Sequence, residues 1–394
     1  MLPCPLEFLW KDARLALPHA RPKHDAAPKA APVAVARPRL PSADAIMPYL
    51  ERIDGARWYS NFGPLLCEFE QRLADRFTGQ AAVITVANAT QALTLTLRAM
   101  DLAPGSYVAL PAWTFVATAH AVTQAGLQPW FLDVDPATWM LDPDHVAELA
   151  RDLNAEVAAV IPVCAFGIMP DIDRWLAFRE ATGVPVLLDA AAAFDTLADA
   201  RLPAVVSLHA TKVLGLGEGG MLATDDAALA MKVRQMTTFG FMGSRESLVQ
   251  ATNAKLSEYA GAVGLAALDQ WPGDRLRWMR TAQMLRIALI GQPQVRFQGG
   301  WSTDWITSVC TVGLPAGTAD HVAASLRADG VDTRQWWGRG CHDSPAFADC
   351  RREPLPVTEA LAASTLGLPF SIDMDAHEIA RVAQALGRAL SHSP

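Results

Sequence analysis

The chain of 394 residues lacks the features typical of nucleic-acid-binding, membrane and metal-binding proteins. Its formal net charge of −8 offers no basic surface for nucleic acid or for an anionic membrane, so neither partner is expected. No apolar run approaches the roughly 20 residues of a membrane span without a charge or a cluster of proline or glycine. The six cysteines contain no CxxC pair, which argues against a zinc site or a disulfide framework and predicts a cytoplasmic location with no metal.

The N-terminal residues also lack the marks of a folded or targeting segment. Residues 1–38 contain repeated Leu-Pro, Ala-Pro and Arg-Pro pairs, with neither the apolar core nor the cleavage site of a signal peptide. We therefore predict a disordered tail over residues 1–38. The remainder is long enough for a large core, and a composition of 51% hydrophobic and 19% charged residues predicts a globular protein of two domains.

From residue 80 onward, apolar runs typical of buried strands alternate with helical patterns. The predicted strands are residues 81–86, 107–110, 129–134, 157–163, 184–188, 204–208 and 220–224. This alternation predicts an α/β fold, in which a mixed, mostly parallel sheet flanked by helices forms a large domain over residues 39–274. After Trp271-Pro272-Gly273 the pattern becomes sparser, so residues 275–394 are predicted to form a small α+β C-terminal domain.

Lysine is scarce, and this scarcity narrows the search for a reactive amine. The six lysines are Lys11, Lys23, Lys29, Lys212, Lys232 and Lys255. Lys212 alone stands between a predicted strand and a glycine-rich segment, residues 215–220. Asp189 follows the preceding strand, so two successive strands bring an amine and a carboxylate to the same edge of the sheet.

An amine and a carboxylate at one sheet edge suit pyridoxal phosphate (PLP). The cofactor is an aldehyde that a lysine can hold, and its pyridine nitrogen must stay protonated for the ring to take up electrons. Desolvation favours a neutral lysine, and a buried aspartate pairs naturally with a pyridinium cation. We therefore predict that Lys212 and Asp189 hold PLP, and a solvated surface lysine remains the alternative for Lys212.

Three further positions would suit a cofactor with a phosphate and a flat ring. Asn88-Ala89-Thr90 joins a strand to a helix, where free backbone amides favour an anion, but an ordinary helix cap has the same pattern. Trp113 follows a strand and offers an indole for stacking, although most tryptophans fill cores. The Ser207 hydroxyl, on the segment that carries Lys212, would either donate to a phosphate or form a hydrogen bond within a turn.

With these residues the chain resembles the DegT/DnrJ/EryC1/StrS family of sugar aminotransferases, which are fold-type-I PLP-dependent enzymes. The resemblance covers about residues 58–390 and rests on six blocks in the same order. The blocks are residues 87–93 (ANATQAL), 111–118 (PAWTFVAT), 134–136 (VDP), 189–191 (DAA), 207–220 (SLHATKVLGLGEGG) and 253–258 (NAKLSE). The resemblance implies a fold of the fold-type-I PLP-transferase kind.

The resemblance also implies a role for each matching residue. Lys212 would form a Schiff base with PLP, Asp189 would pair with the pyridine nitrogen, and Trp113 would stack on the ring. The residues that hold the phosphate would be Ala89, Thr90 and Ser207, together with Asn253 from a neighbouring subunit. Cofactor pockets built from two chains imply an obligate homodimer.

Three residues depart from the family pattern. Ala192 stands where many members carry a Gln or His close to the phenolic oxygen of the cofactor. Ala89 replaces the usual glycine, and Lys255 stands where many relatives have an arginine. Because Ala192 removes a hydrogen-bond donor, we expect it to alter rate and substrate choice more than cofactor binding.

The resemblance and the retained Lys212 predict an aminotransferase that moves an amino group from glutamate or glutamine to a keto group of a nucleotide-linked sugar, in polysaccharide or antibiotic biosynthesis. Relatives that dehydrate deoxysugars carry a histidine in place of this lysine. The alternatives are a PLP-dependent sugar dehydratase or lyase, an aminotransferase for a cyclitol or another biosynthetic ketone, and a non-catalytic PLP-binding regulator. The amino donor, the nucleotide, the position aminated and the stereochemistry stay open.

Two stretches are candidates for facing the substrate. Residues 239–245 and 334–339 contain arginines, which suit phosphate or carboxylate groups. Solvated loops are the alternative for both.

Overall fold

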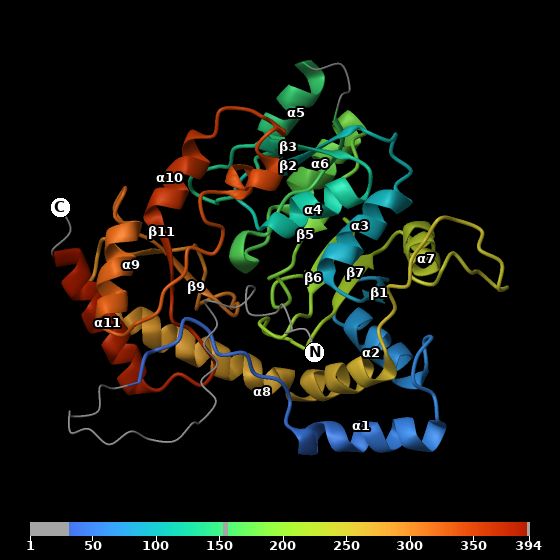
Figure 1. Cartoon of the computed structure of the whole chain (residues 1–394), viewed down its shortest axis with the longest axis horizontal. Coiled ribbons are helices and arrows are strands. Elements are labelled where there is room, and N and C mark those ends of the chain that lie inside the picture. The colour runs from blue at the N-terminus through green and yellow to red at the C-terminus, as the bar shows by residue number, and fades with distance from the viewer. Residues whose placement is uncertain (1–30, 153–156, 392–394) are drawn as a thin grey trace, which may run out of the picture. The chain divides into compact units, whose positions relative to one another are not determined.

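The computed structural model describes residues 31–152 and 157–391 (Figure 1). Most of the predicted disordered tail, residues 1–30, lies outside this part of the chain. Its last residues belong to the folded unit, because Val33 is buried and pairs with Val331, and Ala36 pairs with Phe370. The predicted end of the tail at residue 38 is therefore too late.

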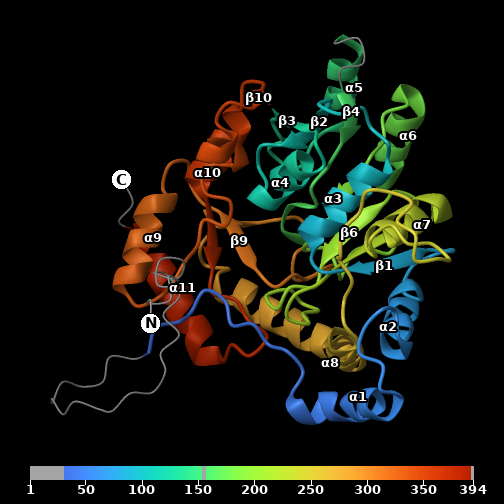
Figure 2. The same ribbon diagram turned by 45° about the vertical axis from the view of Figure 1, so that its right-hand side comes forward.

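Two groups of four strands carry the central sheet. The first contains β1 (Ala82–Val86), β7 (Gly220–Thr224), β6 (Ala204–Ser207) and β5 (Leu188–Asp189), in that order. The second contains β10 (Arg351–Arg352), β3 (Gln128–Leu132), β2 (Tyr107–Pro111) and β4 (Val157–Val160), all parallel (Figure 2). Parallel bridges from Val160 to Val186 and from Val163 to Asp189 join the two groups. Since β7 alone runs antiparallel to its neighbours β1 and β6, the predicted mixed, mostly parallel sheet is confirmed.

The helices of this part are α1 (Ala43–Ala56), α2 (Pro64–Ala74), α3 (Ala89–Ala99), α4 (Val116–Gln124), α5 (Pro143–Asp152), α6 (Ile172–Thr182) and α7 (Ala227–Met236). Several of them pack on the sheet through an apolar face, and polar residues cap the first turns of some. Asn88 caps α3 and Asp226 caps α7. Helix α3 packs against β1, β6 and β7, and α4 packs against β2 and β3, so the first turns of both helices lie beside strand ends.

The C-terminal part forms a smaller antiparallel sheet with its own helices. Its strands lie in the order β11 (Thr365–Leu368), β9 (Cys310–Gly313) and β8 (Arg296–Phe297). The helices of this part are α9 (Ala319–Ala328), α10 (Pro356–Ser364) and α11 (Ala376–Ser391). Strand β10 leaves this part and pairs with β3 of the large sheet, so the C-terminal residues are shared between the two sheets.

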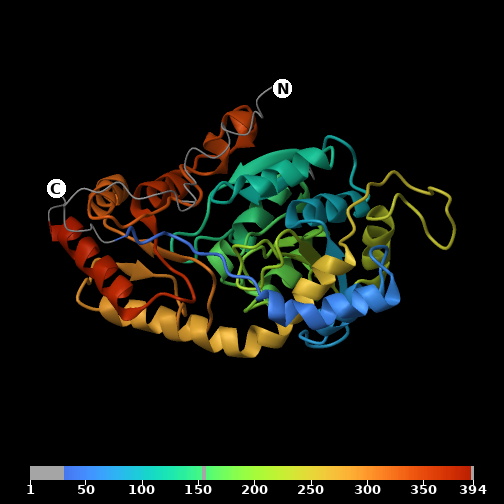
Figure 3. The ribbon, with the colours of Figure 1, turned by 60° about the horizontal axis from the view of Figure 1, so that its bottom comes forward.

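One long helix, α8 (Glu258–Ala288), crosses the predicted domain boundary. It contacts α1 and α2 on the side of the large sheet and α11 on the side of the small sheet (Figure 3). The boundary between residues 274 and 275 thus lies inside a helix that continues through Pro272. The division into a large and a small domain stays a prediction, with α8 as the element that both parts would share.

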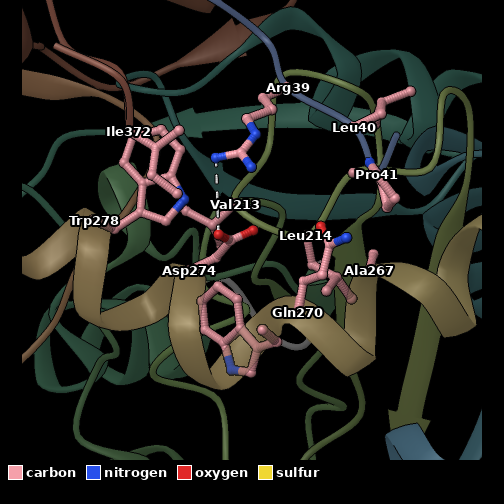
Figure 4. A pocket seen from close by; sticks show the side chains of 12 residues that line it. Arg39, Leu40, Pro41, Val213, Leu214, Ala267, Gln270, Asp274, Trp278 and Ile372 are labelled. Carbon is pink, nitrogen blue, oxygen red and sulfur yellow. Dashed lines mark ion pairs between the residues drawn. The ribbon is translucent and has the colours of Figure 1, made fainter. Parts of the chain in front are cut away.

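Residues 33–41 form a strap that crosses the C-terminal part and reaches α8 at its end. Arg39 reaches Asp274 of α8 at 3.9 Å, beside a small pocket lined by Trp278 and Ile372 (Figure 4). Arg37 forms a 2.7 Å ion pair with Glu378 of α11. In the described part of the chain, none of the helices has the length and apolar character needed to cross a bilayer.

Candidate active site

A cavity of about 500 Å³ lies between the strand ends of the large sheet and residues of the C-terminal part. On the sheet side, its lining includes Asn88, Ala89, Thr90, Asp189, Ala192, Ser207 and Lys212. On the other side, its lining includes Ala36, Thr307, Ser308, Arg334, Trp336 and Trp337. Five of the predicted site residues therefore meet in one cavity, namely Ala89, Thr90, Asp189, Ser207 and Lys212.

Lys212 lies in a tight turn that follows β6. The Lys212 amide donates to the His209 carbonyl at 2.9 Å, and the Ala210 amide donates to the Gly217 carbonyl at 2.8 Å. These bonds fix the backbone from which the lysine side chain enters the cavity. Burial lowers the pKa of the Lys212 amine, while the charge of Asp189 acts in the opposite direction. The site therefore favours a neutral amine, the form that reacts with an aldehyde.

Asp189 is a buried carboxylate at the end of β5. Thr118 of α4 donates to Asp189 Oδ2 at 2.7 Å, and the Ala191 amide donates to Oδ1 at 3.2 Å. Burial raises the pKa of the Asp189 carboxyl, and these two hydrogen bonds and the charge of Lys212 oppose that rise. A buried carboxylate with donors on both oxygens can accept the charge of a protonated pyridine nitrogen.

Thr118 is a site residue that the sequence patterns did not single out. Its side chain is fully buried, and its hydroxyl lies 2.8 Å from that of Thr114, which lines the cavity. Because the Thr118 hydroxyl donates to Asp189, it must accept from Thr114. The available signal was the spacing of the two threonines, because Thr114 lies just before α4 and Thr118 lies in its first turn, four residues further on.

The first turn of α3 forms an anion-binding cradle together with Ser207. Asn88 Oδ1 accepts from the Gln91 amide at 2.9 Å, while the amides of Ala89 and Thr90 have no acceptor among the described residues. Ser207 stands next to this turn because it pairs with Gly220 across β6 and β7. A Cβ at Gly220 would lie 2.5 Å from the Ala89 amide nitrogen, so only glycine allows this approach. Free amides at a helix N-terminus and a hydroxyl suit a phosphate.

The placement of Trp113 does not fit its predicted role on the cofactor ring. Trp113 is 2% exposed, does not line the cavity, and packs edge-on against Trp337 with the ring centroids 5.3 Å apart. Phe115, two residues further on, is 57% exposed and lines the cavity. The chain turns at the end of β2, which directs Trp113 into the core and leaves Phe115 as the aromatic face beside the sheet edge.

Asn253 also lies away from the cavity of its own chain. It forms an antiparallel bridge with Thr238, and Lys255 Nζ donates to Asn253 Oδ1 at 2.6 Å. Thr238 and Asn253 flank the loop between α7 and α8. This loop extends away from the sheet in Figure 1. Residues 239–245 of this loop do not line the cavity, whereas Arg334 of the second predicted stretch does.

Aromatic side chains from both sides of the cavity also line it, Phe166 from the segment after β4 and Trp336 and Trp337 from the C-terminal part. Phe166 stacks on Trp337 with a centroid distance of 4.0 Å and an interplanar angle of 14°. Gly167 has a φ of +115°, and a Cβ there would lie 2.9 Å from the Ala192 carbonyl oxygen. Ala192 lines the cavity and offers no side-chain donor, as expected from the sequence.

The side chains of this cavity fit PLP. Lys212 supplies an amine of lowered pKa, Asp189 a buried carboxylate, α3 and Ser207 an anion cradle, and Phe115 an aromatic face. Each matches one part of the cofactor: the aldehyde, the pyridine nitrogen, the phosphate and the ring. Among the described residues, no cluster of three or more histidines, cysteines or acids could hold a metal ion.

Comparisons with known proteins point in the same direction. The sequence profile of the DegT/DnrJ/EryC1/StrS aminotransferase family matches residues 42–387. Protein Rv3402c of Mycobacterium tuberculosis is 31% identical over 90% of this chain and 89% of its own length. UDP-2-acetamido-2-deoxy-3-oxo-D-glucuronate aminotransferase of Pseudomonas aeruginosa is 30% identical over 82% of this chain and 90% of its own. The crystal structure of DesI with its TDP-sugar product has a TM-score of 0.83 and 34% identity, over 92% of this chain and 93% of DesI.

Proposed function

The chain belongs to the DegT/DnrJ/EryC1/StrS aminotransferase family and is a PLP-dependent aminotransferase, and we propose that it transfers an amino group from glutamate or glutamine to a keto group of a nucleotide-linked sugar. The observation that carries the proposal is the meeting of Lys212 and Asp189 with the anion cradle of α3 in one cavity. The names of two relatives support the substrate class, since one is an aminotransferase of a UDP-linked 3-oxo sugar and the other binds a TDP-sugar product.

Each residue of the cavity takes one role in this proposal. Lys212 would hold the aldehyde carbon of the cofactor, and Asp189 would pair with its pyridine nitrogen. The amides of Ala89 and Thr90 and the Ser207 hydroxyl would donate to its phosphate, and Phe115, which lines the cavity, would cover the ring in place of Trp113. When bound, PLP supplies an aldehyde that exchanges amines and a ring that takes up electrons.

Lys212 also moves the proton. With a substrate amine bound to the cofactor in its place, Lys212 Nζ would be free, and burial, which lowers its pKa, favours the neutral form. A neutral amine accepts a proton from a substrate carbon and returns it at another atom. Burial raises the pKa of the Asp189 carboxyl, and the hydrogen bonds from Thr118 and the Ala191 amide oppose that rise and so favour the ionised form.

The proposal includes a cytoplasmic homodimer. Asn253 pairs with Thr238 and does not line the cavity of its own chain, which is compatible with a place at the phosphate of a second subunit. Light scattering combined with size exclusion would measure the mass in solution. A monomer that binds PLP and responds to glutamate would contradict the shared site.

An absorbance titration tests the aminotransferase reaction. Purified protein with PLP is expected to show the visible band of the lysine-bound cofactor and to lose it on addition of glutamate or glutamine, as the pyridoxamine form appears. Lys212→Ala should show neither the band nor the change. A stable band that ignores both donors, or product formed without donor consumption, would replace the proposal with a dehydratase or lyase.

A further inference from the structure

Arg334 is an arginine of the cavity wall whose backbone is fixed. Its amide donates to the Gly367 carbonyl at 3.1 Å, and its carbonyl accepts from the Gly367 amide at 2.8 Å. These bonds attach it to β11 of the small sheet, on the side of the cavity opposite α3. The rest of its stretch contributes Trp336 and Trp337 to the same wall.

The Arg334 guanidinium has no carboxylate partner among the described residues. Its central carbon lies 5.4 Å from the centroid of the Trp336 ring. By contrast, Arg339 on the same stretch pairs with Asp343 at 3.3 Å and is absent from the cavity lining. The two acidic residues of the cavity lining have other partners. Glu218 faces His209 at 3.7 Å, and Asp189 accepts a hydrogen bond from Thr118.

We propose that Arg334 binds an oxyanion of the substrate and so helps to determine specificity. The guanidinium presents a planar fork of donors that matches carboxylate and phosphate oxygens in two-point contacts. The Trp336 ring restricts the fork, so less freedom is lost when an anion binds. The oxyanion is either the carboxylate of the amino donor or the diphosphate of the sugar nucleotide, because the cofactor phosphate already has its own cradle at α3. This inference rests on the proposed function.

The experiment compares Arg334→Gln, Arg334→Lys and the matched control Arg339→Gln in the PLP-bound protein. The first arm measures the rate at which the visible band is lost in single turnovers at a series of glutamate concentrations. This series gives the half-saturating glutamate concentration and the maximal rate separately. The second arm measures binding of UDP, GDP and TDP by calorimetry. A charge-assisted hydrogen bond predicts a rise of the affected constant by on the order of 10- to 100-fold in Arg334→Gln.

We expect Arg334→Gln to bind one of the two ligands more weakly and to keep a maximal rate within a few-fold of the unsubstituted protein. Arg334→Lys should show a partial effect, and Arg339→Gln should show none. An effect in the glutamate arm alone identifies the donor carboxylate, and an effect in the nucleotide arm alone identifies the diphosphate. Unchanged constants in both arms for Arg334→Gln, or an equal effect of Arg339→Gln, would overturn the inference. A failed proposed function looks different, because then the unsubstituted protein itself does not respond to either amino donor.

Retention of the visible band in each variant shows that the cavity is intact. A loss of the band in Arg334→Gln but not in Arg334→Lys would show that Arg334 serves cofactor binding, and this outcome also contradicts the inference.

Discussion

The two walls of the cavity hold their charged groups in different ways. On the sheet side, Asp189 is 5% exposed and accepts a hydrogen bond from Thr118, which lies behind it in the core. The C-terminal side presents Arg334, whose guanidinium has no carboxylate partner among the described residues. Buried bonds hold reactive groups in one orientation, whereas exposed groups can adapt to different ligands. The difference suggests that the sheet side sets the chemistry and the C-terminal side sets the substrate.

The largest effect is expected for Asp189→Asn, which removes the charge of the sheet side. We expect a loss of turnover on the order of 100-fold or more, because the pyridine nitrogen loses its anionic partner. The charge of Asp189 also raises the pKa of Lys212, so its removal lowers that pKa further. Capture of PLP by the cofactor-free protein requires neutral Lys212 and rises with pH. The rate of PLP capture should therefore reach its maximum at a lower pH in Asp189→Asn, and stopped-flow absorbance measures this rate. A maximum reached at a higher pH would contradict this reasoning.

Thr118→Val tests whether the buried hydrogen bond to Asp189 matters for the chemistry. Loss of the 2.7 Å bond should raise the pKa of Asp189 further. As the pH is lowered, the variant should therefore protonate Asp189 at a higher pH than the unsubstituted protein does. We expect kcat/KM to fall by about 10-fold and the acidic limb of the pH profile to move upward. Thr118→Ser keeps the hydroxyl and is expected to behave as the unsubstituted protein. An identical acidic limb in Thr118→Val would assign Thr118 a packing role only.

Phe115→Leu and Trp113→Phe separate the two aromatic residues that follow β2. Phe115→Leu should raise the dissociation constant of PLP by about 3- to 10-fold, because an aromatic face is lost. Trp113→Phe should lower the melting temperature, since Trp113 is buried against Trp337, with little change in PLP affinity. Fluorescence titration and thermal unfolding measure the two quantities. A loss of PLP affinity in Trp113→Phe but not in Phe115→Leu would assign the stacking role to Trp113 instead.

The smallest effect is expected for Arg37→Ala on the C-terminal side. Its 2.7 Å pair with Glu378 is partly exposed, with 41% of the Arg37 side chain accessible. Such pairs contribute less than about 1 kcal/mol, so urea unfolding should show only a slight decrease in the free energy of unfolding. A loss well above that value would mean that the strap stabilises the C-terminal side more than a surface ion pair can.

The sequence predicted the sheet side better than the C-terminal side for a physical reason. Lys212 and Asp189 follow continuous apolar runs, and strand burial is a local pattern that also fixes which sheet edge a residue reaches. The choice between Trp113 and Phe115 depends on the turn after β2, which breaks the two-residue alternation of an extended strand. No local pattern separates Arg334 from Arg339, because their places depend on pairing with distant residues such as Gly367.

Two expected boundaries differ from the bridges and helix bounds of the structure for related reasons. The strap residues pair through single bridges at Val33 and Ala36, which leave no periodic signal in a proline-rich and alanine-rich segment. Trp271-Pro272-Gly273 reads as a break, yet α8 continues through it. Packing against α1, α2 and α11 outweighs the lost backbone hydrogen bond at Pro272.

Strand β10 has a consequence for how the chain is made. Residues 351–352 cover one side of β3, which is otherwise an open edge of the large sheet. During synthesis on the ribosome that edge remains unpaired until the chain has passed residue 352, and exposed parallel edges invite pairing with other chains. The nascent protein should therefore be most prone to aggregate when stalled before residue 351, and the large sheet should not fold as an autonomous fragment.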